Sequence, residues 1–194
     1  MPATRPSIVY ILADDMGYGD VSCLNERAGF TTPNLDRIAA EGMHFTDAHS
    51  SSAVCTPSRY SVLTGRYNWR SSLKQGVLDG YGGSLIEDGR MTVAGYLQQH
   101  GYATACIGKW HLGWEWPRQS DDRTDIDFSK PIANGPITRG FDYFFGIIAS
   151  LDFPPYVYIG NDTPTAQPDR MTKGEGKRFW REGPTGADFE HEDV

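Results

Sequence analysis

The strongest constraint on the fold is an almost unbroken apolar run close to the N-terminus. Residues 7–15 read SIVYILADD, and the apolar part is rich in β-branched side chains. A run of this kind is typical of a strand buried on both faces, because no polar residue alternates with the apolar ones. Such sheets are mostly parallel and carry helices on their faces, so the run predicts an α/β fold.

Helix and strand signals alternate along the following residues. Three segments open on a capping residue or a proline and end at a glycine, as short helices do, namely residues 31–42, 57–65 and 92–101. Three segments are predicted strands, namely the weakly alternating residues 43–50 and the apolar residues 102–108 (expected to be buried) and 140–147. The alternation predicts a largely parallel central sheet with flanking helices.

We expect the 194 residues to form part of one catalytic domain rather than several domains. The predicted core covers about residues 5–113 and 140–150, and the long segments at about 114–139 and 151–187 are predicted loops because they lack periodicity. The last eight residues, ADFEHEDV, are rich in acid, as the first turn of a helix is. This predicts that the chain is the N-terminal portion of a longer, here truncated, domain.

Composition excludes several classes of partner and site. The formal net charge of −7 argues against a nucleic-acid or anionic-membrane surface, and no apolar run approaches the roughly 18 residues that cross a bilayer. The three cysteines are far apart with no CxxC pair, which is neither a disulfide framework nor a zinc pattern. The N-terminus shows no conventional signal peptide, and the sequence does not assign the protein to a cellular compartment.

Two adjacent carboxylates, Asp14 and Asp15, follow the first predicted strand. Ligand sites of open α/β sheets gather outside the carboxyl ends of strands. Neighbouring carboxylates repel each other unless a cation compensates, and a hard ion such as Ca²⁺ or Mg²⁺ would do so. The alternative is a solvated turn in which the aspartates act as caps.

The segment from Cys55 to Arg59 reads CTPSR and opens a predicted helix. Unpaired backbone N–H groups and the helix dipole favour an anion beside Cys55. Arg59, within the first turn, can bind a tetrahedral oxyanion through two parallel hydrogen bonds. Alternatively, Cys55 packs as a small hydrophobic residue and Arg59 is a surface charge.

A third polar group, Lys109 and His111, lies at the end of the predicted strand 102–108. Residues two apart on a strand share one side, so both are expected to face the same site. A lysine would hold a substrate oxyanion, and an imidazole can exchange a proton at neutral pH. The alternative is a surface lysine beside a half-buried, hydrogen-bonded histidine.

These segments together resemble the type I sulfatases, a formylglycine-dependent family of the alkaline-phosphatase-like superfamily. The Cys-x-Pro-x-Arg element that begins at Cys55 and continues into SVLTGR resembles their first signature, and GYATACIGKWHLG resembles their second. The stretch IVYILADDMGYGD resembles their metal-binding N-terminal strand. The resemblance covers nearly the whole chain and is nearest to arylsulfatase A-like bacterial enzymes.

The resemblance implies that Cys55 is the precursor of formylglycine, an aldehyde that hydrates to a diol. Asp14 and Asp15 match two ligands of a calcium ion, or magnesium, that also contacts the modified residue 55. One diol oxygen would attack sulfur as an alkoxide and expel the alcohol. Deprotonation of the other hydroxyl would then eject sulfate and restore the aldehyde.

The resemblance also assigns the cationic residues. Arg59 matches the residue that holds the formylglycine, Lys109 a sulfate-binding lysine, and His111 a histidine that hydrogen-bonds the diol. Nothing in residues 115–194 matches the family's further metal ligands or its second histidine and lysine, and His191 belongs to the acidic helix start. We therefore expect about half of the active site in this chain.

The implied function is hydrolysis of the sulfate monoester of a carbohydrate or aryl alcohol. The implied partners are a sulfated small molecule or glycan, a formylglycine-generating or anaerobic sulfatase-maturating enzyme, and the downstream part of the domain. The resemblance favours a periplasmic or secreted location for the protein. The alternatives are a phosphonate or phosphate ester hydrolase of the same superfamily and a truncated, non-catalytic chain. Aromatic residues at Trp114, Trp116 and 154–158 would stack on sugars, form core, or face the downstream part.

Overall fold

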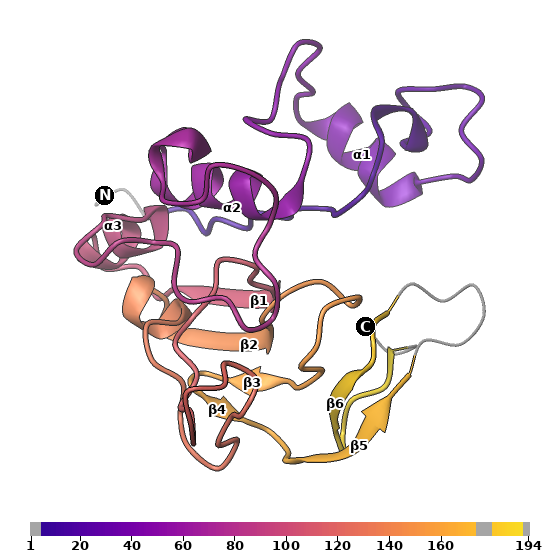
Figure 1. The fold of residues 1–194 in the computed structure, drawn as a ribbon. Coiled ribbons are helices and arrows are strands. Elements are labelled where there is room, and N and C mark those ends of the chain that lie inside the picture. The colour runs from indigo at the N-terminus through magenta and orange to yellow at the C-terminus, as the bar shows by residue number, and fades with distance from the viewer. Residues whose placement is uncertain (1–4, 174–179, 192–194) are drawn as a thin grey trace. The chain divides into compact units, whose positions relative to one another are not determined.

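The structure, a computed structural model, describes residues 5–173 and 180–191 (Figure 1). The chain divides into two compact units, Met1–His49 and Ser50–Val194. The predicted C-terminal helix would continue through residues 192–194, which lie outside the described residues. No helix in the described part of the chain combines the length and apolar character that a bilayer crossing requires.

The first unit contains a short 3₁₀ helix, η1 (Tyr18–Asp20), and one α-helix, α1 (Pro33–Glu41). The α1 helix confirms the prediction for residues 31–42, with proline in its first turn and Gly42 donating its N–H to Ile38 O at 2.9 Å. The carboxylate of Asp36 accepts hydrogen bonds from the hydroxyls of Ser22 (2.6 Å) and Thr32 (2.8 Å). These bonds fasten the preceding loop to the helix.

Both strands predicted for the first unit are wrong in the described residues. Residues 7–15 and 43–50 form no strand, and the side chains of the apolar run are exposed, reaching 83% for Val9. An apolar pattern favours burial, but a strand forms only where a second strand pairs its N–H and C=O groups. The described residues of this unit offer no such partner.

The second unit opens with two helices that confirm their predictions. Helix α2 (Cys55–Thr64) ends at Gly65, whose left-handed φ of 65° a glycine adopts without strain. Helix α3 (Val93–Gln99) begins where Thr92 Oγ1 accepts a 3.0 Å hydrogen bond from the N–H of Gly95. A short 3₁₀ helix, η2 (Asn68–Arg70), follows α2.

A four-stranded sheet in the order β1-β2-β3-β4 lies below these helices in Figure 1. The first two strands are parallel, as the predicted segments 102–108 and 140–147 require, and the remaining pairings are antiparallel. The α/β class is confirmed, and the described sheet is mixed. Its strands are β1 (Ala105–Lys109), β2 (Tyr143–Ile147), β3 (Ile159–Gly160) and β4 (Thr163–Pro164).

The predicted burial of strand 102–108 is wrong, because β1 forms one edge of this sheet. The side chain of Ile107 is 66% exposed, and none of the five residues of β1 is fully buried. The chain reaches the parallel β2 through a long connection that includes η3 (Pro136–Arg139), as a parallel pair demands.

The segment 151–187, predicted as a loop, contains β3 and β4 and a separate antiparallel pair, β5 (Pro168–Thr172) and β6 (Gly183–Gly186). Prolines and glycines within these short strands hide them from a search for alternating apolar residues. Beyond β6, the ring of His191 stacks on Trp180 with centroids 4.3 Å apart.

The predicted loop 114–139 contributes to the main core. Trp114 and Trp116 are 1% and 5% exposed and meet edge to face with centroids 5.3 Å apart. Trp114 also contacts the ring of Phe144 on β2, 6.1 Å away. These tryptophans are therefore core residues. Of the three roles that the sequence left open for them (sugar stacking, core packing and contact with the downstream part), the structure supports core packing.

Candidate functional site

The six predicted site residues are divided between the two units. Asp14 and Asp15 belong to the first unit, and the other four belong to the second. In the second unit Cys55 and Arg59 lie in the first turn and a half of α2, while Lys109 and His111 lie at the carboxyl end of β1. Hydrogen bonds join these two locations.

Cys55 is the first residue of α2 and is half-buried. The helix begins here because Val54 is extended (φ −130°, ψ 163°) and its carbonyl accepts hydrogen bonds from both the N–H (3.3 Å) and the hydroxyl (2.8 Å) of Ser58. Pro57 suits the first turn, where no intrahelical N–H is needed. The side chain of residue 55 therefore stands at the positive end of the helix dipole.

Arg59 connects α2 to the sheet. Its Nη1 donates a 2.5 Å hydrogen bond to the carbonyl oxygen of Lys109, the last residue of β1. Burial raises the pKa of the neighbouring Cys106 thiol to about 11, and the positive charge of Arg59 acts in the opposite direction. A fixed cation is thus held where β1 ends.

The chain after β1 continues to pair with β2. The N–H groups of Trp110 and His111 donate to Ile147 O (2.9 Å) and Ile148 O (2.7 Å). His111 nevertheless has a left-handed φ of 58°, which ends the alternation of sides. Spacing alone therefore does not make Lys109 and His111 face the same way, and the structure gives a half-buried lysine and a fully buried histidine.

A backbone link that the sequence did not reveal joins His111 to the start of α2. The Nε2 atom of His111 lies 2.7 Å from the carbonyl oxygen of Leu78, and because a carbonyl only accepts, Nε2 carries the hydrogen. The N–H of Leu78 donates in turn to Oγ1 of Thr56, the residue after Cys55, at 3.2 Å. Both groups of Leu78 are backbone, so no side-chain pattern marks this position.

Asp14 and Asp15 are exposed in the first unit, and Asp15 has a left-handed φ of 57°, which aspartate tolerates better than most residues. Their carboxylate oxygens are the donors that Ca²⁺ and Mg²⁺ prefer. Within residues 5–173 and 180–191 there is no group of three or more His, Cys, Asp or Glu side chains suited to a metal ion. The two aspartates fit a hard cation in chemistry and supply only part of the six to eight ligands of calcium.

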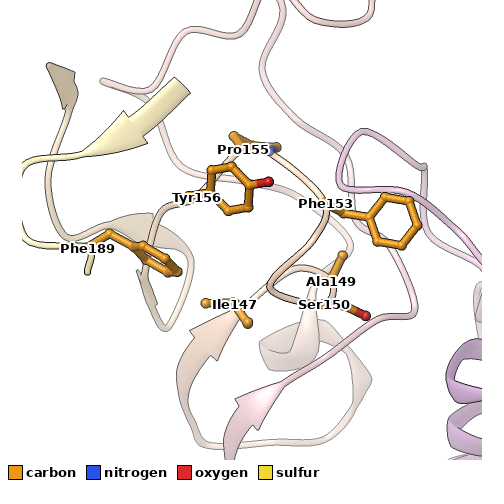
Figure 2. Close-up of a pocket in the computed structure, with 7 residues that line it drawn as sticks. All are labelled: Ile147, Ala149, Ser150, Phe153, Pro155, Tyr156 and Phe189. Atoms are coloured by element: carbon orange, nitrogen blue, oxygen red, sulfur yellow. The ribbon is translucent and has the colours of Figure 1, made fainter. Parts of the chain in front are cut away.

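A pocket beside the carboxyl end of β2 is distinct from these residues (Figure 2). It has no room for a water-sized molecule, whereas ligand sites usually enclose roughly 300–1,000 Å³. Its lining is mostly apolar and contains none of the six predicted residues. The lining residues are Ile147, Ala149, Ser150, Phe153, Pro155, Tyr156 and Phe189.

Comparison with known proteins decides the family. Residues 6–173 match the family model described as Sulfatase, which is most of the chain. The chain belongs to the sulfatase family. The resemblance of its motifs to type I sulfatases is thereby confirmed.

Curated sulfatases are similar to this chain over most of its length. An N-acetylgalactosamine-6-O-sulfatase of Bacteroides thetaiotaomicron is 40% identical over 157 residues, which cover 81% of this chain and 29% of that protein. Arylsulfatase G of Rattus norvegicus is 43% identical over 151 residues, 77% of this chain and 25% of that protein. The chain thus spans less than a third of these relatives.

Solved sulfatases share the fold. A structure described as BT33336S-sulf, from work on glycosaminoglycan metabolism by Bacteroides thetaiotaomicron, matches 88% of this chain and 36% of its own, with a TM-score of 0.71 and 37% identity. The structure of Ps i-CgsB matches 72% of this chain and 27% of its own, with a TM-score of 0.57 and 30% identity. The predicted alkaline-phosphatase/sulfatase-like fold, represented in part, is confirmed.

Proposed function

We propose that this chain carries the nucleophile side of a sulfatase active site that hydrolyses sulfate monoesters. The observation that carries the proposal is the first turn of α2, where the Cys-x-Pro-x-Arg element is folded with Arg59 bonded to the carbonyl of Lys109. This contact joins the helix that begins at Cys55 to the last residue of β1, and it supports a site at that end of the sheet. Membership of the sulfatase family supports the reaction class.

In this proposal Cys55 is converted to formylglycine, whose hydrated aldehyde supplies the oxygen nucleophile that attacks sulfur. The backbone N–H groups at the start of α2 and the guanidinium of Arg59 hold the negative oxygens of the ester. Lys109 binds a sulfate oxygen from the end of β1. Each donor aimed at developing oxyanion charge contributes about 3–4 kcal/mol to transition-state stabilisation.

His111 hydrogen-bonds the modified residue and assists its proton transfer. The carbonyl of Leu78 holds the ring in one orientation, with the hydrogen on Nε2. Because Leu78 also bonds Thr56 beside Cys55, a shift of the loop would move the histidine and the start of α2 together. Leu78 therefore acts as a positioning residue.

Asp14 and Asp15 would hold part of a Ca²⁺ site, or of a Mg²⁺ site, as the resemblance to type I sulfatases implies. A bound divalent ion supplies positive charge against the sulfate oxygens. The two aspartates have the right donor atoms and only part of the ligand number. No step of the reaction is assigned to them beyond holding the ion.

The proposed substrate is the sulfate ester of a carbohydrate or aryl alcohol, in keeping with relatives named N-acetylgalactosamine-6-O-sulfatase and arylsulfatase G. The proposed partners are a formylglycine-generating or anaerobic sulfatase-maturating enzyme and the downstream part of the domain. We place the protein in the periplasm or outside the cell, where an enzyme can reach sulfated glycans.

The test is expression of the protein together with a maturating enzyme, followed by mass spectrometry of the peptide that contains Cys55. Conversion of thiol to aldehyde lowers the peptide mass by about 18 Da. Turnover of an aryl sulfate by a full-length version of the protein, which supplies the downstream half of the site, should accompany the mass change and be absent from its Cys55→Ala variant. Faster turnover of an aryl phosphodiester by the full-length version would favour the phosphonate or phosphate hydrolase instead, and modification of Cys55 without any turnover by that version would favour a non-catalytic protein.

A further inference from the structure

An exposed pair of aromatic rings follows the C-terminal end of α2. Tyr67 and Trp69 are stacked with centroids 4.1 Å apart and planes 11° from parallel, and they are 56% and 55% exposed. Large aromatic rings usually bury most of their surface. Two that stack on each other in water present a flat apolar face, and such faces mark binding sites.

The backbone beneath the pair is held firmly. Ser71, 2% exposed, donates its hydroxyl hydrogen to Asn68 O at 2.7 Å. The Nζ of Lys74 donates to the carbonyls of Trp69 (2.9 Å) and Ser71 (2.6 Å). These bonds fix the η2 turn, so a ligand that stacks on Tyr67 or Trp69 would not have to order it.

The segment that carries the pair is basic although the chain as a whole is negative. Residues 66–78 contain three cations, Arg66, Arg70 and Lys74, and no acid, in a chain of formal net charge −7. Arg66 is bonded to Glu87 at 3.2 Å, whereas Arg70, the residue after Trp69, and Lys74, which bonds the Trp69 carbonyl, are exposed. An apolar face edged by cations is complementary to a pyranose ring, whose C–H face is apolar and whose edge carries sulfate or carboxylate.

The pair lies at some distance from the proposed nucleophile on the same unit. Helix α2 runs from Cys55 to Thr64, which at 1.5 Å per residue is about 14 Å along its axis. The loop that bears the rings then returns to the start of the helix, where Leu78 bonds Thr56. A sugar on the rings is therefore a different unit from the one whose ester contacts residue 55.

We propose that Tyr67 and Trp69, with Arg70 and Lys74, form a distal subsite for a sugar of an anionic oligosaccharide that is remote from the reacting unit. The inference rests on the proposed sulfatase function for the nature of the ligand. It narrows the substrate class from any sulfate ester to a sulfated or uronic-acid-containing glycan of several units.

The test is calorimetric titration of the protein with a tetrasaccharide that contains 6-O-sulfated N-acetylgalactosamine and uronic acid, with its unsulfated counterpart, and with the sulfated monosaccharide. Trp69→Ala should weaken tetrasaccharide binding about tenfold, or ~1.4 kcal/mol, and Trp69→Phe should restore most of it. Arg70→Gln should weaken binding less and flatten its salt dependence. The loss in Trp69→Ala should be at least fivefold larger for the tetrasaccharide than for the monosaccharide.

Tyr96→Ala is the matched control, because Tyr96 on α3 is also exposed (53%) and packs on a second ring, that of His100 at 4.3 Å. This variant should bind all three saccharides as the wild type does. Equal tetrasaccharide affinity of Trp69→Ala and wild type would overturn the subsite, and so would an equal loss for tetrasaccharide and monosaccharide. Binding that depends on Trp69 in a full-length version that turns over no aryl sulfate would leave the subsite standing and reject the proposed reaction.

Discussion

Gly146 on β2 offers the sharpest test of how the sheet positions the site. It pairs with Gly108 on β1, next to Lys109. A Cβ atom at position 146 would lie 1.8 Å from the carbonyl oxygen of Gly108 and 2.6 Å from its carbonyl carbon. Both atoms are backbone, so no side-chain rotation can relieve the clash that Gly146→Ala would create.

The size of the effect follows from this geometry. An ordinary contact begins near 3.4 Å, so β1 and β2 must separate by roughly 1.5 Å at this point. Overpacking of that kind costs about 1–3 kcal/mol, and each backbone hydrogen bond lost from the five-residue parallel pairing costs about 1 kcal/mol more. We expect Gly146→Ala to lower the free energy of unfolding by about 3 kcal/mol, or the melting temperature by about 6–12 °C.

The assay is urea unfolding followed by tryptophan fluorescence, because the buried Trp110 and Trp114 report on this unit. Gly160→Ala on β3 is the matched control, since its added Cβ would meet only Thr165 Cγ2 at 3.8 Å. It should unfold within about 0.5 kcal/mol of wild type. If Gly146→Ala were as stable as the control, the close approach of β1 and β2 would be refuted, and with it the placement of Lys109.

Three further predictions concern the same unit. Trp114→Ala should cost about 3–5 kcal/mol in urea unfolding, because Trp114 is 1% exposed, whereas Trp69→Ala should change stability by less than about 0.5 kcal/mol; equal effects would contradict the assigned core. Thr92→Ala removes the N-cap hydrogen bond of α3 and the hydrogen bond that the buried Thr92 hydroxyl donates to Arg139 O, and it should cost about 2–3 kcal/mol in urea unfolding, with Thr92→Ser restoring most of it. Burial raises the pKa of the Cys106 thiol from 9.0 to about 11. The stabilisation that comes from the neutral thiol is therefore complete below pH 9 and is lost as the pH rises to 11. The difference in unfolding free energy between wild type and Cys106→Ala should shrink over that range, and a constant difference would refute the shift.

The elements that could be predicted from sequence are those with local signals at their ends. Proline and glycine mark α1 and α2, and Thr92 caps α3 with its own hydroxyl. The strands β1 and β2 were found from apolar runs that end in glycine or a polar residue. In each case the information lies within a few residues of the boundary it predicts.

The elements that could not be predicted depend on distant partners. The run at residues 7–15 has the composition of a strand, but its state is decided by whether another strand pairs with it. Trp114 and Trp116 lie in a segment without periodicity, and their burial follows from contact with Phe144 on β2. The local sequence pattern cannot distinguish such buried tryptophans from an exposed aromatic pair like Tyr67 and Trp69, because both occur as aromatic residues in segments without periodicity.

The candidate site also combines features that the local sequence predicts with features that depend on distant partners. The Cys55–Arg59 element is local, and its placement in the first turn of α2 follows from Pro57 and the helix period. The hydrogen bond from Arg59 to the Lys109 carbonyl joins a helix to a strand 50 residues further along the chain, so it could be found only from the fold. The hydrogen bonds through Leu78 use only its backbone, so substitution of that side chain would leave the donor and acceptor in place. A sequence motif therefore suffices to propose the chemistry of this site, whereas the Leu78 backbone groups that orient His111 and Thr56 require the fold, in which the loop between α2 and α3 returns to the start of α2.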